Sequence, residues 1–364
     1  MKKKIILFED SSKVGFGGGQ NITLQVADIL SKEYNISFID FTSSSRYFKL
    51  IDEKFHNDKK IIFRSGIIKR TKNKHLQLIN EALAFIIFRN SNIKRLASEI
   101  DLNGCVIYAT TRRALMYSEK INKKFGIPYV YHAHLVERTN SLGYRFIKNA
   151  LINAKSIICV SKVVQRSIQL KNTMLLYNPS PHNQKTKSEK KDNRFVIASI
   201  GSLIQIKGVE HFIKAAKMFD DISNVEFRVY GEGIQKNELQ QMANKNVVMK
   251  GFCSNIIEEL KNEIDILVLC TTIEEALPTV IIEAKSVGIP VIATNIGGQA
   301  EIVEDGIDGF LIPTKSETAI CESIKKFIFD IDTYNRMSNS SLKSAQRFSS
   351  SKFEKKLLNE IDKL

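Results

Sequence analysis

Short apolar runs alternate with longer stretches of helical spacing along the whole chain. The runs of the first half lie at Ile5–Phe8, Ile36–Ile39, Cys105–Ala109, Tyr129–Tyr131 and Ser156–Val160. Between them, apolar residues recur with helical spacing, as in Asn21–Ser31 and Leu76–Ile100. Apolar strands separated by helices are typical of a parallel sheet that is covered by helices on both faces. The pattern therefore predicts an α/β protein with doubly wound, Rossmann-like sheets.

A polar stretch with two prolines interrupts this pattern at residues 178–193, and the pattern then restarts. The second half is predicted to hold strands at Phe195–Ile200, Glu226–Tyr230, Val247–Lys250, Ile266–Leu269 and Pro290–Ala293, and helices at Val209–Asp220, Glu238–Ala243 and Val280–Val287. We expect an N-terminal domain at 1–177, a linker at 178–193 and a C-terminal domain at 194–339. Residues 340–364 are a last amphipathic, Lys-rich helical stretch, for which packing back on the N-terminal domain is one option. Two such domains put a ligand-binding cleft between the carboxyl ends of their sheets.

Length, composition and cysteines agree with this organisation. The chain has 364 residues, of which 43% are hydrophobic and 26% charged, a balance that favours two globular domains over a disordered chain. The apolar run after the first lysines stops too early for a signal-peptide core, and no run is long enough for a membrane span. The five cysteines lie mostly in apolar runs without close-spaced pairs, which favours reduced core thiols over disulfides or a zinc site. These features indicate a cytoplasmic protein.

Positive charge is concentrated in the first half of the chain. Lys and Arg number 54 against 39 Asp and Glu, which gives a net charge of +15. Residues 1–180 hold 30 basic and 13 acidic residues, whereas the remainder holds 24 basic and 26 acidic ones. The whole excess therefore belongs to the N-terminal half, where nucleic acid, a membrane surface or an anionic substrate are the candidate partners.

The segment from Ile266 to Phe310 carries the most specific pattern. After a predicted strand, the loop E-E-A-L-P-T at 274–279 leads into a helix that begins near Val280. Proline near a helix start costs no hydrogen bond, and Thr279 can cap the helix. Free amides and the helix dipole at such a start suit a phosphate group. Two carboxylates, Glu275 and Glu283, fall in the loop and about one turn into the helix.

The sequence E-A-L-P-T-V-I-I-E-A at 275–284, followed by V-G-I-P-V-I-A-T and G-G-Q-A-E-I-V-E-D-G, resembles the retaining, nucleotide-sugar-dependent GT-B glycosyltransferases of the group 1, or family 4, type. The resemblance continues through G-S-L-I-Q-I-K-G at 201–208, G-E-G at 231–233, Ser161, Y-N-P at 177–179 and G-G-G at 17–19. These markers follow one another in order over most of the chain. The resemblance implies the GT-B fold, in which the C-terminal domain binds the nucleotide sugar and the N-terminal domain binds the acceptor.

The resemblance also implies how the leaving diphosphate is neutralised. Members of the family use protein cations and amides for this purpose, with no metal ion and no cofactor, the nucleotide sugar being a substrate. Of the basic pair in their G-R-x4-K motif this chain keeps Lys207, but Ser202 stands where the arginine is expected. Serine donates a hydrogen bond without a charge, so either another basic residue fills the gap or activity is reduced.

The catalytic residues that the resemblance implies are Lys207, Glu275 and His134. Glu275 matches the glutamate near the donor sugar, and we give it a stabilising or positioning role. His134 matches the histidine near the reacting sugar, and His132 is the rival assignment.

Further residues are implied to bind the donor. Glu283 matches the glutamate that holds the ribose hydroxyls, and Gly17 and Gly18 lie in a loop that faces the donor diphosphate. Their order does not match the dinucleotide fingerprint G-x-G-x-x-G. The donor-binding set is Gly17, Gly18, Ser202, Lys207, Gly231, Gly233, Ala276, Leu277, Pro278, Thr279 and Glu283, with Ala276 and Leu277 in place of the usual glycine and phenylalanine.

The activity implied is transfer of a hexose-type sugar from a nucleotide diphosphate, UDP being the commonest, to a lipid-linked or glycan acceptor in bacterial surface polysaccharide (O-antigen or capsule) biosynthesis. Retention would arise from front-face attack, in which the departing phosphate oxygen takes the acceptor's proton. The alternatives are a sugar isomerase or phosphorylase of the same fold, a catalytically weak partner subunit, and a basic nucleic-acid-binding protein.

The segment 59–95 suggests a role for the excess of basic residues in the first half of the chain. It holds ten basic residues and one acidic residue, Glu81, interleaved with apolar ones. A basic, apolar helix suits the surface of an anionic membrane, and a solvated helix face is the alternative. We therefore expect peripheral attachment to the inner face of the cell membrane through this segment. No nucleic-acid recognition motif accompanies the charge and Trp is absent, so nucleic acid is not an expected partner.

Overall fold

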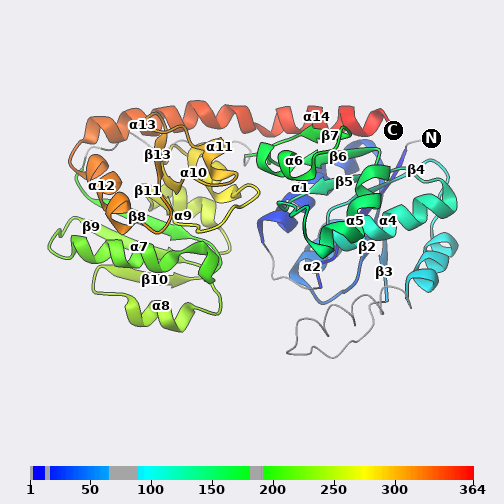
Figure 1. Ribbon diagram of the computed structural model, residues 1–364, viewed down its shortest axis with the longest axis horizontal. Coiled ribbons are helices and arrows are strands. Elements are labelled where there is room, and N and C mark those ends of the chain that lie inside the picture. The colour runs from blue at the N-terminus through cyan, green and yellow to red at the C-terminus, as the bar shows by residue number, and fades with distance from the viewer. Residues whose placement is uncertain (1–2, 13–16, 65–87, 181–189, 191) are drawn as a thin grey trace. The chain divides into compact units, whose positions relative to one another are not determined.

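The computed structural model describes the chain except for residues 1–2, 13–16, 65–87, 181–189 and 191. The chain divides into two compact units. Unit 1 comprises Met1–Val160, Val164–Leu176 and Glu354–Leu364, and unit 2 comprises Ser161–Val163 and Tyr177–Phe353. Each unit is a parallel sheet with helices packed against it (Figure 1). The predicted α/β class is therefore confirmed.

Seven parallel strands form the sheet of unit 1, in the order β3-β2-β1-β4-β5-β6-β7. They are β1 Lys4–Phe8, β2 Asn35–Asp40, β3 Lys59–Ile62, β4 Cys105–Ala109, β5 Tyr129–Ala133, β6 Ser156–Cys159 and β7 Thr173–Leu175. Strands β4, β5 and β6 are buried along their whole length, as expected for central strands covered on both faces. The order runs outward in both directions from β1 and β4, so the doubly wound switch point lies between these two strands.

Helices connect the strands of unit 1. They are α1 Gly18–Glu33, α2 Arg46–Lys54, α4 Arg112–Phe125, α5 Leu142–Asn153 and α6 Lys162–Ile168, and residues 88–99 are also helical. Local capping explains where three of them begin, because the side chains of Ser45, Thr111 and Ser141 each accept a hydrogen bond from an amide three residues on. Helix α4 ends at Gly126, which adopts the left-handed conformation (φ 73°) that stops a helix.

Six parallel strands form the sheet of unit 2, in the order β10-β9-β8-β11-β12-β13. They are β8 Phe195–Ile200, β9 Val225–Tyr230, β10 Val247–Gly251, β11 Ile266–Leu269, β12 Val291–Thr294 and β13 Gly309–Ile312. This order repeats the plan of unit 1, with the switch point between β8 and β11. Both predicted doubly wound sheets are thus present.

The helices of unit 2 follow the same alternation. They are α7 Val209–Ala216, α8 Lys236–Met242, α9 Ile256–Asn262, α10 Thr279–Ser286, α11 Gln299–Ile302, α12 Glu317–Ile328 and α13 Ile331–Ala345, with 3-10 turns η1 Gln205–Lys207, η2 Lys217–Phe219 and η3 Gln346–Phe348. The predicted helix 209–220 changes to 3-10 geometry after Ala216.

The last helical stretch is divided into two helices. Helix α13 passes into η3, Ser349 is not helical, and α14 then runs over Ser350–Asp362. Within unit 1, the hydroxyl of Tyr34 donates to Asp362 at 2.5 Å. Lys32 on α1 also pairs with Glu354 on α14 at 3.0 Å. Side chains of α14 thus bind directly to α1 and the residue that follows it.

The basic segment 59–95 does not begin as a helix. Lys59–Ile62 is strand β3, which pairs in parallel with β2 and buries Ile61 completely. The description of the whole segment as a basic, apolar helix is therefore wrong for its start, where Ile61 and Phe63 pack into the apolar interior of unit 1. Residues 65–87 of the segment lie outside the described residues. In the part of the chain that the structure describes, no helix has both the length and the apolarity to cross a bilayer.

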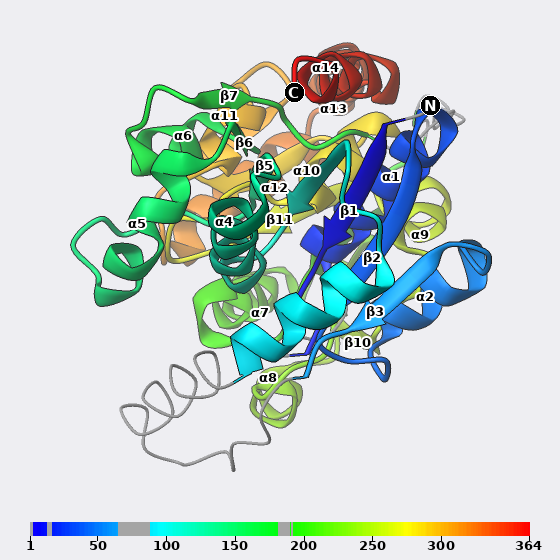
Figure 2. The same ribbon diagram turned by 90° about the vertical axis from the view of Figure 1, so that its right-hand side faces the viewer.

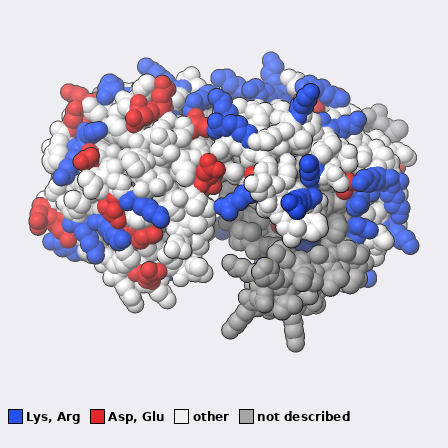
Figure 3. Space-filling view, in the orientation of Figure 1, with Lys and Arg blue, Asp and Glu red and all other residues white. Residues whose placement is uncertain are grey.

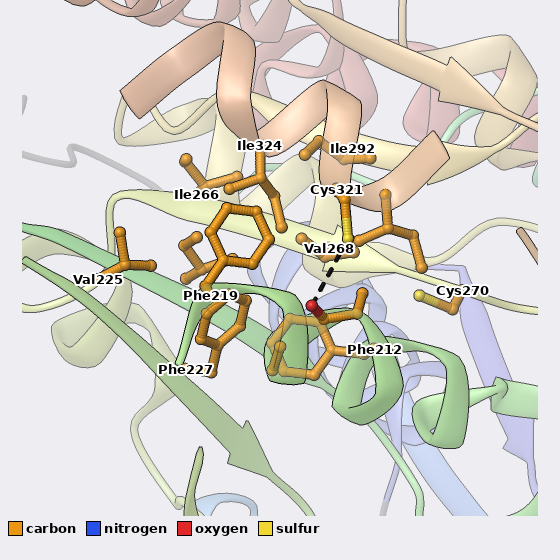
Figure 4. Close-up of a cluster of buried hydrophobic side chains, with 14 of the residues drawn as sticks. Phe212, Phe219, Val225, Phe227, Ile266, Val268, Cys270, Ile292, Cys321 and Ile324 are labelled. Carbon is orange, nitrogen blue, oxygen red and sulfur yellow. Dashed lines mark hydrogen bonds between the residues drawn. The ribbon is translucent and has the colours of Figure 1, made fainter. Parts of the chain in front are cut away.

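Aromatic rings fill the core of unit 2 on one face of its sheet (Figure 4). The ring of Phe227 on β9 lies 5.5 Å from those of Phe212 and Phe219, centroid to centroid. The thiol of Cys321 on α12 donates to the carbonyl of Ala215 at 3.5 Å (Figure 4). Four of the five cysteines are buried free thiols, and Cys253 is partly exposed.

One ion pair lies in the interior of unit 2. The ammonium of Lys285 on α10 contacts Asp308 at 2.6 Å and the carbonyl of Ile302, and neither charged side chain has appreciable exposed surface. The second oxygen of Asp308 accepts the amide of Glu304 at 2.9 Å. The pair therefore fixes α10 to the turn before β13, and removing either charge would leave the other one buried alone.

We expect Lys285→Met to lower the free energy of unfolding of unit 2 by about 3–5 kcal/mol, because Asp308 would remain buried without its cation. The loss should appear in urea unfolding and as faster hydrogen exchange of the β12 amides. Lys325→Met, on the exposed side of α12, is the matched control and should change stability by no more than about 0.5 kcal/mol. An unchanged Lys285→Met protein would contradict the structural role of the pair.

Candidate active site

The residues predicted for the site in unit 2 gather at the carboxyl ends of its parallel strands. The segment after β8 carries Ser202 and Lys207, the segment after β9 carries Gly231 and Gly233, and the segment after β11 carries Glu275. Strands β9, β8 and β11 are neighbours in the sheet, so these segments leave it along one edge. This edge is where open α/β sheets bind ligands.

The turns after β8 and β9 approach each other backbone to backbone. A Cβ atom at Gly231 would lie 1.8 Å from the carbonyl oxygen of Gly201, and one at Gly233 would lie 2.2 Å from that of Leu203. Only glycine permits this approach. Ser202 lies on the same turn and is exposed to solvent. The two turns thus place backbone atoms and the side chain of Ser202 at the carboxyl edge of the sheet.

Lys207 is brought to the site by the packing of the turn η1 against the end of β11. The next residue, Gly208, is left-handed (φ 63°), and a Cβ atom there would lie 2.2 Å from the carbonyl oxygen of Cys270. This approach sets the Nζ atom of Lys207 2.7 Å from the Oε2 atom of Glu275. Two predicted catalytic residues that are 68 positions apart are therefore in direct contact.

Glu275 is held by its side chain and by its backbone. The hydroxyl of Thr271 donates to Oε1 at 2.6 Å, while Lys207 binds Oε2. The amide of Gly298, in the segment after β12, donates to the backbone carbonyl of Glu275 at 2.8 Å. Thr271 lies two residues after the end of β11 and is 1% exposed. Its contact with Glu275 is a feature that the sequence motif does not reveal.

Helix α10 begins one residue earlier than predicted and without the predicted cap. Pro278 occupies the cap position and has no capping hydrogen bond, whereas Thr279 is the first helical residue. The expectation that Thr279 caps the helix is wrong, because Pro278 occupies the cap position and Thr279 already lies in the first turn. Burial raises the pKa of Glu283 to about 7, and the bond from Thr279 offsets part of that rise. Ala276 is partly exposed in this loop, and Leu277 and Pro278 are buried.

The predicted residues of unit 1 lie at the carboxyl end of its own sheet. Gly17 is the extended cap residue of α1 and Gly18 its first residue, and both are exposed. A Cβ atom at Gly19 would lie 3.9 Å from the ring of His134. The glycine loop and His134 are therefore neighbours.

The two histidines of β5 differ in accessibility. His132 is fully buried and its Nδ1 atom bonds to the hydroxyl of Tyr108 at 2.8 Å. His134 follows the strand and keeps some exposed surface, with its ring 4.1 Å from that of His132. Burial lowers the pKa of His134 to about 4, so its ring is neutral at pH 7. Of the two, only His134 has exposed side-chain surface, and its Nε2 atom is itself buried without a hydrogen-bond partner among the described residues.

Two buried carboxyl groups at this edge of unit 1 were not predicted. Glu9 follows β1 and accepts hydrogen bonds from Thr110 at 2.6 Å and Thr23 at 3.0 Å. Burial raises its pKa to about 7, and burial also raises the pKa of Asp40, at the end of β2, to about 6. The available signal was a carboxylate directly after a strand at the switch point, a position shared by many ligand-binding residues.

The predicted site residues of unit 2 could bind an anion and, beside it, the hydroxyl groups of a ligand. The ammonium of Lys207 and the uncapped first turn of α10 supply positive charge and amide donors. The carboxyl of Glu283 can accept hydrogen bonds from neighbouring hydroxyls of a ligand. Within the described ranges, no three His, Cys, Asp or Glu side chains are grouped as metal ligands would be.

Comparison with known proteins decides the family. A family model described as "Glycosyl transferases group 1" matches residues 181–344, which include all of the predicted site residues of unit 2. The structure of HepE from Anabaena in complex with UDP-glucose matches 100% of both chains with a TM-score of 0.79 at 21% identity. The chain is a glycosyltransferase with the GT-B fold, and its residues 181–344 match group 1. The expected GT-B fold is confirmed, and the expected group 1 resemblance is confirmed over residues 181–344.

Curated relatives are also similar to this glycosyltransferase. An alpha-1,4-N-acetyl-D-galactosaminyltransferase of Campylobacter jejuni is 23% identical over 349 residues, which cover 91% of each chain. Its name gives a diphosphate-linked undecaprenol glycan as acceptor. The capsular polysaccharide glycosyltransferase CapM of Staphylococcus aureus is 26% identical over 220 residues, 52% of this chain and 57% of CapM.

The contact between Thr271 and Glu275 yields a test of positioning in the glycosyltransferase. Thr271→Val keeps the side-chain shape but leaves Oε1 of Glu275 without its donor, and we expect the turnover number to fall about tenfold or more with little change in KM for the nucleotide sugar. Thr271→Ser keeps the hydroxyl and should restore most of the rate. Equal losses in both variants, or a loss confined to KM, would show that Thr271 acts only through packing.

Proposed function

We propose that this glycosyltransferase moves a hexose-type sugar from a nucleotide diphosphate, UDP in the first instance, to a lipid-linked or glycan acceptor with retention of configuration. The product would belong to a bacterial surface polysaccharide such as O-antigen or capsule. The observation that carries the proposal is the contact between Lys207 and Glu275 at the strand ends of unit 2, with Glu283 on the following helix. This set combines charge for a diphosphate with a hydroxyl acceptor for a ribose.

Several features support a nucleotide sugar as donor. The lysine and the amides at the start of α10 suit the diphosphate, and the carboxyl of Glu283 suits the ribose. The similar HepE structures contain UDP, and one of them contains UDP-glucose. We further propose that the enzyme needs neither a metal ion nor another cofactor, because Lys207 and the amides take the role that a metal ion would have at the leaving group.

The state of Glu275 supports a positioning role over a covalent one. Both carboxylate oxygens are engaged, one by the ammonium of Lys207 and the other by the hydroxyl of Thr271. A carboxylate that is paired in this way is a weaker nucleophile than a free one, because its negative charge is already stabilised. Retention would then arise by attack from the face of the leaving group, whose phosphate oxygen takes the acceptor's proton.

The acceptor is proposed from the relatives. The Campylobacter enzyme is named for a diphosphate-linked undecaprenol acceptor, and CapM is named for capsular polysaccharide biosynthesis. A lipid-linked acceptor agrees with the excess of basic residues in the first half of the chain. We keep the proposal that the protein works in the cytoplasm and attaches peripherally to the anionic inner face of the membrane, with the segment 59–95 as the contact expected from the sequence.

One alternative function has a specific observation in its favour. Ser202 is exposed and uncharged at the position where the family's arginine is expected, which fits a catalytically weak partner subunit. A sugar isomerase or phosphorylase of the same fold would also use the site of unit 2. Product analysis separates these functions, since only a transferase joins the donor sugar to a separate acceptor without free phosphate.

We expect one nucleotide to stand out when thermal shifts are measured with nucleoside diphosphates and their sugars. Glu283→Ala should abolish that preference, because the ribose hydroxyls lose their acceptor, and the same protein should lose sugar transfer to a lipid-diphosphate acceptor. Lys325→Ala, on the surface of α12, is the control and should bind like the wild type. Unchanged nucleotide binding in Glu283→Ala would remove the ribose assignment, and nucleotide binding without transfer would favour the partner subunit.

The raised pKa of Glu283 yields a pH dependence. With a pKa of about 7 in the free protein, the carboxyl is largely protonated below that pH and charged above it. Ribose hydroxyls donate more strongly to the charged form, so affinity for a nucleotide sugar should rise through neutral pH and fall by up to about tenfold for each pH unit below 7.

Calorimetry with the intact nucleotide sugar measures this effect cleanly, because a free diphosphate would itself take up a proton near pH 6. Glu283→Gln cannot titrate and should give a flat profile over the same range. A profile of unchanged slope in that variant would assign the pH dependence to another group.

A further inference from the structure

Helix α5 of unit 1 presents an apolar edge to solvent. Its buried side carries Tyr144, Ile147 and Leu151, whereas Leu142 is 62% exposed and Phe146 is 66% exposed. These two residues are four positions apart, so they lie one above the other on the same side of the helix. Large apolar side chains that are exposed together on one element mark an interaction surface more often than isolated ones do.

Neighbouring positions extend this surface. Leu135, in the loop before α5, is 55% exposed, and Ile152 in its last turn is 49% exposed. Helix α5 packs beside α4 (Figure 2), and its exposed apolar side chains lie away from the buried side of the helix. We call the exposed side of the loop and helix over residues 135–155 the α5 surface.

The charge on the α5 surface has one sign. Residues 138–176 include seven Lys and Arg and no Asp or Glu. Four of the basic residues are exposed on or beside the helix, namely Arg138, Arg145, Lys148 and Lys155. None of the four pairs with a carboxylate in the described part of the chain. Over the described part of unit 1, the charged side chains seen in Figure 3 are likewise mostly blue.

Other basic residues of unit 1 differ in this respect. Lys4 pairs with Asp101 at 2.5 Å, Lys59 pairs with Glu99 at 3.1 Å, and Arg95 binds the same glutamate at 2.6 Å. Positive charge elsewhere in the unit is thus partly neutralised within the chain, whereas that of the α5 surface is available to an external anion. The combination of unpaired cations and exposed apolar tips is the feature to be explained.

We propose that the α5 surface docks on an anionic lipid bilayer. Leu142 and Phe146 would enter the region between headgroups and acyl chains, and Arg145 and Lys148 would contact lipid phosphates. A nucleic acid would use the cations but leave the apolar tips against phosphates and water, and an acidic protein surface would have to supply an apolar pocket as well. A bilayer offers both environments at once. The inference rests on the proposed function, in which the acceptor is held in a membrane.

This surface is distinct from the segment expected from the sequence. The basic residues at 69–74 lie outside the described residues, whereas the α5 surface consists of described side chains on a capped helix. The two contacts make different predictions, because only the α5 surface depends on Leu142 and Phe146.

Co-sedimentation of the full chain with vesicles tests the proposal. The wild type should bind phosphatidylcholine vesicles that contain phosphatidylglycerol, bind pure phosphatidylcholine vesicles far more weakly, and release as salt is raised. Arg145→Gln with Lys148→Gln should weaken binding by about fivefold for each charge removed. Leu142→Ser with Phe146→Ser should weaken it further while leaving the dependence on phosphatidylglycerol in place.

Matched controls lie on unit 2. Phe329→Ser removes a phenyl ring that is 71% exposed, and Lys217→Gln with Lys325→Gln removes two exposed charges. Both control proteins should bind vesicles like the wild type. Every variant should bind the nucleotide sugar in solution as the wild type does, which shows that it is folded.

Three outcomes would overturn the proposal. In the first, the wild type does not bind the vesicles. In the second, the α5 variants bind as well as the wild type, and neutral replacements of Lys69, Arg70, Lys72 and Lys74 abolish binding. In the third, the α5 surface binds DNA and does not bind vesicles. These three outcomes do not test donor binding, because binding of the nucleotide sugar is measured in solution without a membrane. Failure of the proposed function would instead appear as absent nucleotide binding in every protein, whatever the vesicles do.

Discussion

Parallel pairing of β8, β9, β11 and β12 is the constraint on which the site of unit 2 depends. In the register of the sheet, Ile200 lies opposite Tyr230 and Leu269 lies opposite Ala293, so the following segments leave the sheet at matched heights. The amino acids that contact one another come from segments that are far apart in sequence. An antiparallel pairing would send half of these segments to the opposite edge, and the contact between Lys207 and Glu275 could not form.

Close packing of backbone converts this common edge into defined distances. The turns after β8 and β9 touch through glycines, and Gly208 lies against the end of β11. These contacts leave little freedom for the backbone that carries Lys207 and Glu275. Thr271, which is buried two residues after the end of β11, then fixes the orientation of the glutamate side chain. The rigid sheet and the small residues around it thus preorganise the charged groups before a ligand arrives.

The sequence predicts the core strands of both sheets well, because central parallel strands are runs of apolar residues. The prediction Phe195–Ile200 coincides with β8. Strand β7 is missed because its three residues are only partly buried, and β3 is missed because its lysines hide the apolar alternation. Such edge strands are defined by their neighbours more than by their own composition.

The same distinction holds for the site. Lys207 and Glu275 are found because their motifs are specific, and their contact follows from the fold. Thr271 is missed, since a threonine after a strand is common and its partner is set by tertiary placement. The role of Thr279 is predicted wrongly, because Pro278 takes the cap position and Thr279 becomes the first helical residue. Local patterns therefore give the identity of charged residues more readily than the hydrogen bonds that orient them.

Under the proposed function, Ser202 in place of the expected arginine leaves Lys207 with a larger share of the charge that faces the diphosphate. An ammonium has three N–H donors, and the contact with Oε2 of Glu275 needs one of them. The remaining donors can bind a phosphate oxygen while the ion pair persists, so the lysine can bridge the carboxylate and a bound diphosphate. Without that bridge, the negative charges of Glu275 and of the diphosphate would repel each other across a short distance.

A second fixed cation at position 202 would relieve this repulsion, and the exposed serine there can offer only a neutral hydrogen bond. The amides at the uncapped start of α10 are the other donors on this edge, which makes the geometry of that helix start more critical here than in a site with two cations.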